Sequence, residues 1–174
     1  SNADGLILDY TSQEIENKFR VEHNLRFNGF KLIYGAGYEF VKYNNSTFQR
    51  INTPVGLDTI DFESALSFHK YNAFGTISRK FADDRLVASF GLRMDGNSYS
   101  SEMSNPFEQI SPRLSLSYYL TPSLSLNANT GIFYQLPPYT VLGYRDINGT
   151  LVNRDNGSRY IRASHAVAGI EYNT

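Results

Sequence analysis

Histidine is the first residue type to test for chemistry, because it binds metals and acts as a general base near neutral pH. The three histidines, His23, His69 and His165, lie far apart and show no His-x-x-x-His spacing. A Ser-His-Asp triad would have to form from residues that are distant in the sequence, and the many serines of the chain make a chance match easy to find. We therefore predict no catalytic residue, no metal site and no cofactor, and we predict that the protein is not an enzyme.

Two short motifs could suggest ligand binding, but each has a structural explanation. Gly35-Ala36-Gly37 lacks the third glycine of a dinucleotide loop and lies inside a strand pattern, where glycine allows a close approach of neighbouring groups. Asp83-Asp84 has too few acidic neighbours for a calcium site and is typical of a turn. Neither motif points to a binding site.

Composition narrows the class of protein. The chain has 174 residues, enough for one domain, and a net charge of −1, which argues against nucleic acid as a partner. It contains no cysteine, so disulfides and thiolate metal sites are impossible. No run approaches the roughly 18 apolar residues of a membrane helix. The lack of a long apolar run is compatible with a transmembrane β-barrel, whose strands carry apolar residues at every second position.

Alternation of apolar and polar residues is the dominant pattern. Leu114, Leu116 and Tyr118 alternate with polar neighbours, a short turn follows at 121–123, and residues 124–134 alternate again. Side chains in a strand change face at every residue, so this pattern predicts a hairpin with one apolar face and one polar face.

The same signals extend over the whole chain. Seven strands are predicted, at about 16–27, 30–43, 66–81, 85–95, 110–120, 124–134 and 160–173. Their connections are 28–29, 44–65, 82–84, 96–109, 121–123 and 136–159. Asn28-Gly29 is a strong hairpin signal. The alternation of strand 66–81 is poor, so we assign no faces to it.

Short and long connections alternate, which places all the short ones at one end of a meander. Outer-membrane barrels have short periplasmic turns and long extracellular loops. Eleven residues span about 36 Å, or about 25 Å at a tilt of about 45°, which is the height of the apolar band of such a barrel. We predict an all-β, antiparallel up-and-down meander of about seven long strands, part of a larger transmembrane β-barrel.

Two groups of residues are candidate functional positions. The polar strand faces carry charges that we expect to line a water-filled lumen, although an ordinary solvated face would look the same: Arg20, Glu39, Arg93, Asp95 and Arg113. The predicted long loops carry aromatic and arginine residues that we expect to contact a ligand: Phe48, Arg50, Tyr139, Tyr144 and Arg145. The alternative is that they are ordinary loop residues without a binding role.

Several segments resemble one family. Residues 110–118 and 124–134, with Leu136-Pro137-Pro138 after them, resemble barrel strands of TonB-dependent outer-membrane receptors. Gly91-Leu92-Arg93-Met94-Asp95 resembles the Gly-Leu-Arg-Tyr-Asp strand of these barrels, with Met where Tyr is common. Residues 163–172 resemble the strand after the Pro-Pro loop. The order of the segments also matches.

This resemblance implies an outer-membrane receptor of a Gram-negative cell that takes up an iron chelate, cobalamin or a glycan. Such a receptor closes a barrel of about 22 strands around a plug, and the TonB complex pulls on a short N-terminal box. We expect residues 4–174 to be a partial barrel domain without plug or TonB box, and residues 1–3 to be a cloning scar. Outer-membrane lipid, the plug, the TonB complex and a small nutrient are the implied partners.

Two other classes of protein stay open at this point. One is a soluble all-β ligand- or carbohydrate-binding module, whose apolar face would pack inward. The other is an outer-membrane protease or lipase. Removed from lipid, a partial barrel would expose its apolar face, so we expect it either to self-associate or to curl with its leucines turned inward.

Overall fold

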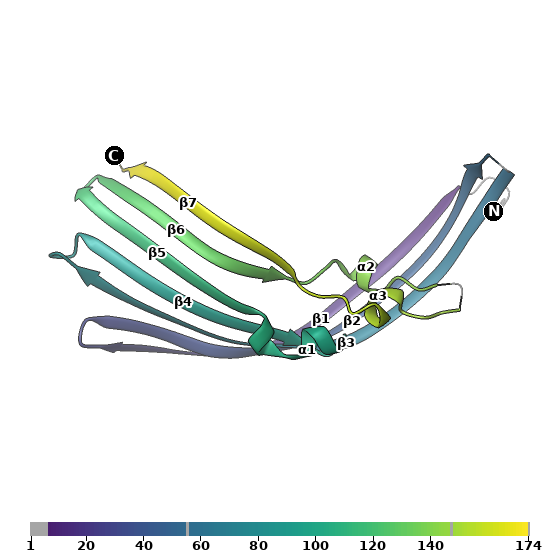
Figure 1. Ribbon diagram of the computed structural model, residues 1–174, viewed down its shortest axis with the longest axis horizontal. Coiled ribbons are helices and arrows are strands. Elements are labelled where there is room, and N and C mark those ends of the chain that lie inside the picture. The colour runs from purple at the N-terminus through teal and green to yellow at the C-terminus, as the bar shows by residue number, and fades with distance from the viewer. Residues whose placement is uncertain (1–6, 55, 147, 174) are drawn as a thin grey trace.

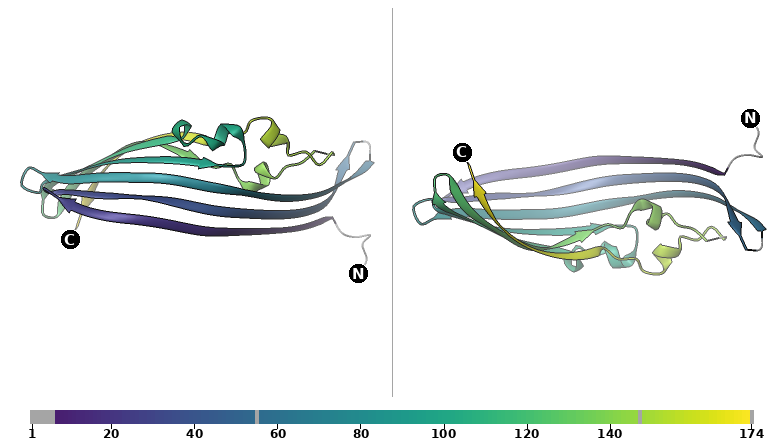
Figure 2. Two further views of the ribbon diagram at one scale, coloured as in Figure 1. Left: turned by 90° about the horizontal axis from the view of Figure 1, so that it is seen from below. Right: turned by 90° about the horizontal axis from the view of Figure 1, so that it is seen from above.

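A single antiparallel sheet dominates the computed structural model, which describes residues 7–54, 56–146 and 148–173. Its strands pair strictly in chain order, and together they curve like a section of barrel wall (Figures 1 and 2). The strands are β1 (Leu8–Phe27), β2 (Phe30–Thr53), β3 (Gly56–Phe81), β4 (Leu86–Asn97), β5 (Ile110–Thr121), β6 (Leu124–Gln135) and β7 (Ile161–Tyr172). The predicted all-β meander is confirmed.

Short helices occupy the two long connections. They are α1 (Ser101–Ser104) and η2 (Pro106–Glu108) between β4 and β5, and α2 (Tyr139–Leu142) and α3 (Val152–Asp155) between β6 and β7. In the part of the chain that the structure describes, no helix has the length and apolar character needed to cross a bilayer.

The predicted sorting of connections by length is confirmed at one end of the sheet only, because β2 and β3 are joined by a short turn at the other end. The turns β1–β2, β3–β4 and β5–β6 lie together at the left of Figure 1, the helical connections lie nearer the middle, and the short β2–β3 turn lies at the far right. Asn28 and Gly29 have φ angles of 47° and 78°, as a two-residue hairpin turn requires. The Asn28-Gly29 turn therefore has the backbone conformation that the sequence predicts.

The predicted loop at 44–65 is wrong. β2 and β3 stay paired from Asn44↔Ala65 to Thr53↔Gly56, and β1 likewise begins at Leu8 rather than near residue 16. These extensions carry polar residues on both faces, so they lack the apolar alternation by which a strand is recognised. Proline cannot donate to a β ladder, and Pro54 accordingly lies in the turn between the two strands.

Strand register assigns the two faces, including those of β3. Lys70 lies opposite Glu39, and Asn72 lies opposite Asp95, so these residues share one face. Pairing also places the predicted lumen residues on that face, which is the concave one: Arg20, Glu39, Arg93, Asp95 and Arg113. The alternation of β3 is hidden because Phe68 on this face is also apolar.

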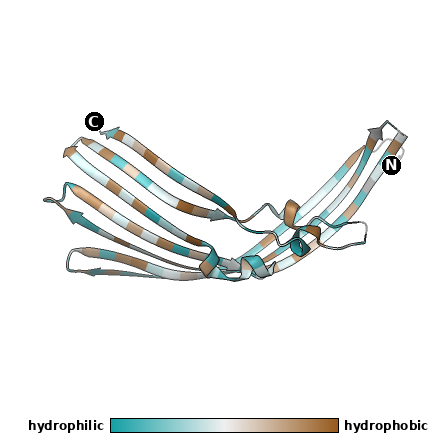
Figure 3. Ribbon diagram, viewed as in Figure 1, coloured by the Kyte–Doolittle hydropathy of each residue, from teal (hydrophilic) through white to brown (hydrophobic). Residues whose placement is uncertain are grey.

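The convex face carries an exposed apolar band. Its large side chains are each more than a third exposed, among them Phe19, Val21, Leu25, Phe27, Phe90, Leu92, Leu114, Leu116, Tyr118 and Leu126. Figure 3 shows the resulting alternation of hydrophobic and hydrophilic residues along the strands. The expected inward curl of the leucines is therefore wrong for Leu114, Leu116 and Leu126, while self-association stays a prediction.

The band has the height of a bilayer core. Tyr71 and Phe81, ten residues apart along β3, mark its limits. That length is about 33 Å, or about 23 Å at a tilt of about 45°, close to the roughly 25 Å apolar band of outer-membrane barrels. Beyond Tyr71 the convex face of β2 and β3 becomes polar at Lys42, Asn44 and Glu63, all exposed. β1, β2 and β3 therefore continue beyond the band into water.

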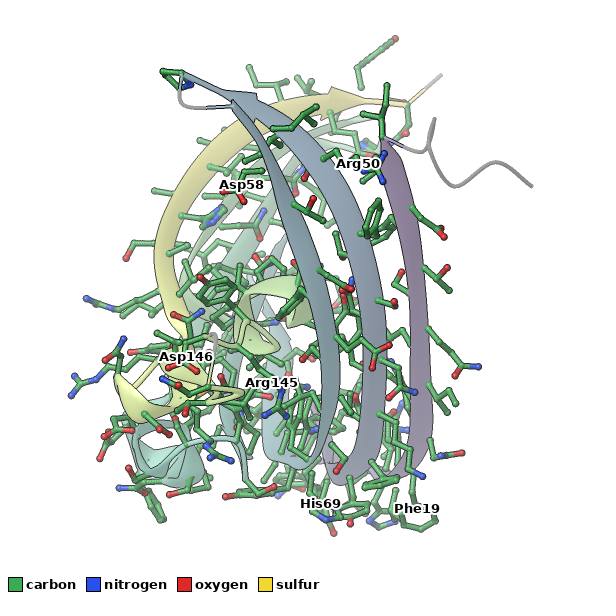
Figure 4. The ribbon with its side chains drawn as sticks, turned by 90° about the vertical axis from the view of Figure 1, so that its right-hand side faces the viewer. Phe19, Arg50, Asp58, His69, Arg145 and Asp146 are labelled. Atoms are coloured by element: carbon green, nitrogen blue, oxygen red, sulfur yellow. The ribbon has the colours of Figure 1, made fainter. Side chains whose placement is uncertain are left out.

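The buried core lies on the concave face, outside the level of the band. Strands β2 and β3 contribute one half of it and the two long connections contribute the other, and every member is at most 6% exposed: Val41, Tyr43, Leu66, Phe68, Tyr99, Met103, Leu142 and Leu151. Both connections are thus held against the inner wall. In Figure 4, Phe19 and His69 lie on the outer side of the curved sheet, and Arg145 lies on the inner side.

Candidate ligand site

A cleft of about 450 Å³ opens on the concave face between β1–β2 and the segment that leaves β6. Pro137 and Pro138 restrict this segment to an extended path before α2 begins, and the path crosses the inner wall. Residues from both sides line the cleft, among them Tyr10, Ser12, Glu14, Tyr43, Gln135 and Tyr139. The cleft lies at the end of the sheet that carries the long connections.

Two lysines and two glutamates form an ion cluster beside the cleft. The Lys70 ammonium lies 2.6 Å from Glu39 Oε2 and 2.9 Å from Glu16 Oε1. Lys18 Nζ lies 2.5 Å from Glu16 Oε2 and 3.9 Å from Glu39 Oε2. Lys18, Glu39 and Lys70 are register partners on adjacent strands, which explains why opposite charges meet here.

Tyr139 joins this cluster to α2. Lys70 Nζ donates to the Tyr139 hydroxyl over 3.1 Å, and that hydroxyl donates to Glu16 Oε1. Burial, reinforced by the hydrogen bond to the Glu16 carboxylate, raises the pKa of Tyr139 to about 12. The hydroxyl therefore keeps its proton at neutral pH and remains a donor.

Further contacts fix the rest of the β6–β7 connection to the wall. The Tyr99 hydroxyl donates to Leu142 O over 2.7 Å, and Ser64 Oγ donates to Gly143 O. Arg145 Nη2 donates to Ala65 O over 2.8 Å, across the unpaired edge of β3. Side chains of β3 and of both long connections therefore hold one site together.

The structure brings only some of the predicted ligand residues together. Tyr139 and Arg145 lie in the connection against the inner wall, and Tyr144 is about half exposed with its ring 6.1 Å from that of Phe62. Phe48 and Arg50 are not loop residues: both belong to β2, where they lie on the convex face, away from the cleft. Their expected role in ligand binding stays a prediction.

The cleft also contains residues that the sequence did not suggest. Tyr10, Ser12 and Glu14 lie in the part of β1 that the alternation did not identify as a strand. In a strand, Tyr10, Ser12 and Glu14 share one face and Thr11 and Gln13 share the other. Both faces are largely polar here, so the sequence shows no contrast between them. Only the strand register shows which set faces the cleft.

Deeper on the concave face, the charged residues are paired with their neighbours. Arg93 holds the carboxylate of Asp95 through two atoms, Nε over 2.8 Å and Nη2 over 2.6 Å. The guanidinium of Arg20 lies 4.3 Å from the centre of the Phe74 ring, and that of Arg113 lies 4.5 Å from the centre of the Phe133 ring. Arg93 and Arg20 are thus paired with the carboxylates of Asp95 and Glu22, while Arg113 lies against an aromatic ring.

Metal ligands do not gather in this region. Within the described ranges, no three His, Asp or Glu side chains are grouped so that they could hold a metal ion. His69 lies on the convex face, where its Nδ1 is 2.6 Å from the Tyr38 hydroxyl. His23 is paired in the same way with Tyr34, over 3.0 Å.

Comparison with known proteins assigns the family. No curated protein matches the chain. Among solved structures, "Copper transporter OprC" is similar with a TM-score of 0.67 and 22% sequence identity, covering 96% of this chain and 28% of that one. The chain thus spans little more than a quarter of that structure, and the likeness shows the fold.

The family model "TonB dependent receptor-like, beta-barrel" matches residues 2–171. The chain belongs to this family of TonB-dependent receptors, as part of the β-barrel that lies in the outer membrane of Gram-negative cells.

Proposed function

We propose that this chain forms a section of the barrel wall of a receptor that takes up a small nutrient. The observation that carries the proposal is the exposed apolar band on the convex face, limited by aromatic residues at both ends. Such a band is stable in lipid and costly to expose to water. A soluble binding module would instead turn this face into its core.

The concave face then lines the lumen. We propose that Arg20, Glu39, Arg93, Asp95 and Arg113 face water and the plug, because their face is polar and curves away from the apolar band. The cleft lies at the end with the long connections, which is the extracellular end in outer-membrane barrels. A nutrient would therefore reach the cleft from outside, and the family range of iron chelate, cobalamin or glycan defines the candidates.

Cysteine labelling of the full-length receptor in intact cells tests this orientation. A membrane-impermeant maleimide is expected to label Ser46→Cys, which lies on the convex face beyond the band, but not Ala88→Cys, which lies within it. Ser123→Cys, in a short turn, should be labelled only after the outer membrane is permeabilised. Labelling of Ser123→Cys but not Ser46→Cys in intact cells would reverse the orientation and refute the proposal.

A further inference from the structure

We propose that the cleft between β1–β2 and α2 binds a neutral, polyhydroxylated ligand, that is, a saccharide. This inference rests on the proposed uptake function and names the substrate class of its extracellular site. The ligand would stack on Tyr10 and form hydrogen bonds with the hydroxyl and amide groups of the cleft.

The tyrosines give the cleft an aromatic wall that is already positioned. Tyr10 is 50% exposed, while Tyr43 behind it is only 4% exposed. Tyr10, Ser12 and Tyr43 line the cleft together, and Asn45 Nδ2 donates to the Tyr43 hydroxyl over 3.2 Å. Tyr43 is therefore buried and fixed in the wall of the cleft, while half of the Tyr10 surface stays accessible. An aromatic face of this kind packs against the C–H groups of a sugar ring at low conformational cost.

The charges around the cleft disfavour an anionic chelate. The lysines that approach it are already neutralised, since Lys70 lies between Glu16 and Glu39 and Lys18 lies against Glu16. Glu14 adds another carboxylate to the lining. An anion here would meet no unpaired cation among the lining residues that the structure describes, and its desolvation would not be offset. Among the described lining residues, none is an arginine that could form a bidentate contact with a carboxylate.

The remaining lining groups suit hydroxyl recognition. Ser12, Gln135 and Thr140 provide neutral donors and acceptors, and they come from both walls of the cleft. A volume of about 450 Å³ lies within the range of small-molecule sites. Neutral hydrogen bonding, an aromatic platform and the absence of surplus positive charge together favour a saccharide over an anionic iron chelate.

Isothermal titration of the purified full-length receptor tests this inference. The probes are a panel of neutral oligosaccharides of glucose, xylose, mannose and galactose, with ferric citrate as the anionic comparison. We expect at least one oligosaccharide to bind and ferric citrate not to bind. Tyr10→Ala should weaken saccharide binding by about tenfold or more, because a central aromatic anchor is lost. Tyr119→Ala is the matched control, since Tyr119 is 41% exposed on the same face at the opposite end of the sheet.

Two results would overturn the inference. One is a receptor that binds no member of the oligosaccharide panel, whether or not ferric citrate binds. The other is saccharide binding that is equally strong in Tyr10→Ala. Failure of the proposed function is distinguishable, because it would appear as a wrong labelling pattern at Ser46, Ala88 and Ser123. A correctly labelled receptor that binds no saccharide refutes the substrate class alone.

Discussion

Replacing Leu114 by arginine should destabilise the membrane-inserted barrel by about 2–4 kcal/mol, the cost of a cation near the middle of the lipid-facing band. Leu114 is 42% exposed on the convex face, between Phe90 and Thr130 of the neighbouring strands. An arginine there has no aqueous phase within easy reach. Urea unfolding of the full-length receptor in lipid vesicles measures the loss.

The adjacent residue provides the control. Ser115 lies on the concave face, with Ser89 and Asn129 beside it. Ser115→Arg should change the free energy of unfolding by less than about 1 kcal/mol, because the new cation reaches water. Equal losses at Leu114 and Ser115 would contradict the assignment of the two faces.

Replacing Lys70 by alanine should release α2 from the inner wall. Lys70 is the cation between Glu16 and Glu39, and their side chains are only 17–22% exposed. Its removal leaves the two carboxylates with only the exposed Lys18 ammonium beside them, and it also removes a donor to the Tyr139 hydroxyl. Removing one partner of a buried ion pair costs about 3–5 kcal/mol, and partial exposure reduces this to about 2–3 kcal/mol.

Hydrogen exchange reports this effect locally. The amides of Val141, Leu142 and Gly143 donate to carbonyls of Pro138 and Tyr139, so their protection depends on α2 remaining in place. Their protection factors should fall by roughly 30- to 150-fold in Lys70→Ala, the equivalent of about 2–3 kcal/mol.

Lys18→Ala is the matched control for this cluster. Lys18 contacts the same two glutamates, but its side chain is 58% exposed. Exposed ion pairs contribute about 0–1 kcal/mol, so the protection of these amides should change little. If Lys18→Ala and Lys70→Ala had the same effect, the ion cluster would not be what holds α2 in place.

The elements that face lipid were readable from the sequence, because a bilayer imposes strict alternation. β4, β5 and β6 lie within one or two residues of their predicted limits, and Asn28-Gly29 forms the predicted turn. Outside the band this constraint disappears. Residues 44–53 and 8–15 carry polar residues on both faces with only scattered apolar ones, and in them backbone pairing rather than an apolar alternation defines the strand.

The cleft could not have been predicted for a different reason. Tyr10 and Tyr139 are far apart in the chain, and they line one cleft only because the β6–β7 connection folds across the inner wall of β1 and β2. The sequence did not show on which face of β3 Lys70 lies, because Leu66 and Phe68 on the same face are apolar and belong to the core. Register and curvature, which depend on the whole sheet, decide both points.

The most direct test of the two-faced wall is a spin-label scan of β5 in the full-length receptor in lipid vesicles. Labels at Leu114, Leu116 and Tyr118 should be accessible to oxygen dissolved in lipid, while labels at Ser115 and Ser117 should be accessible to a water-soluble nickel chelate. Accessibility should therefore alternate with a period of two residues. Uniform accessibility along β5, or chelate access at the leucines, would contradict the account.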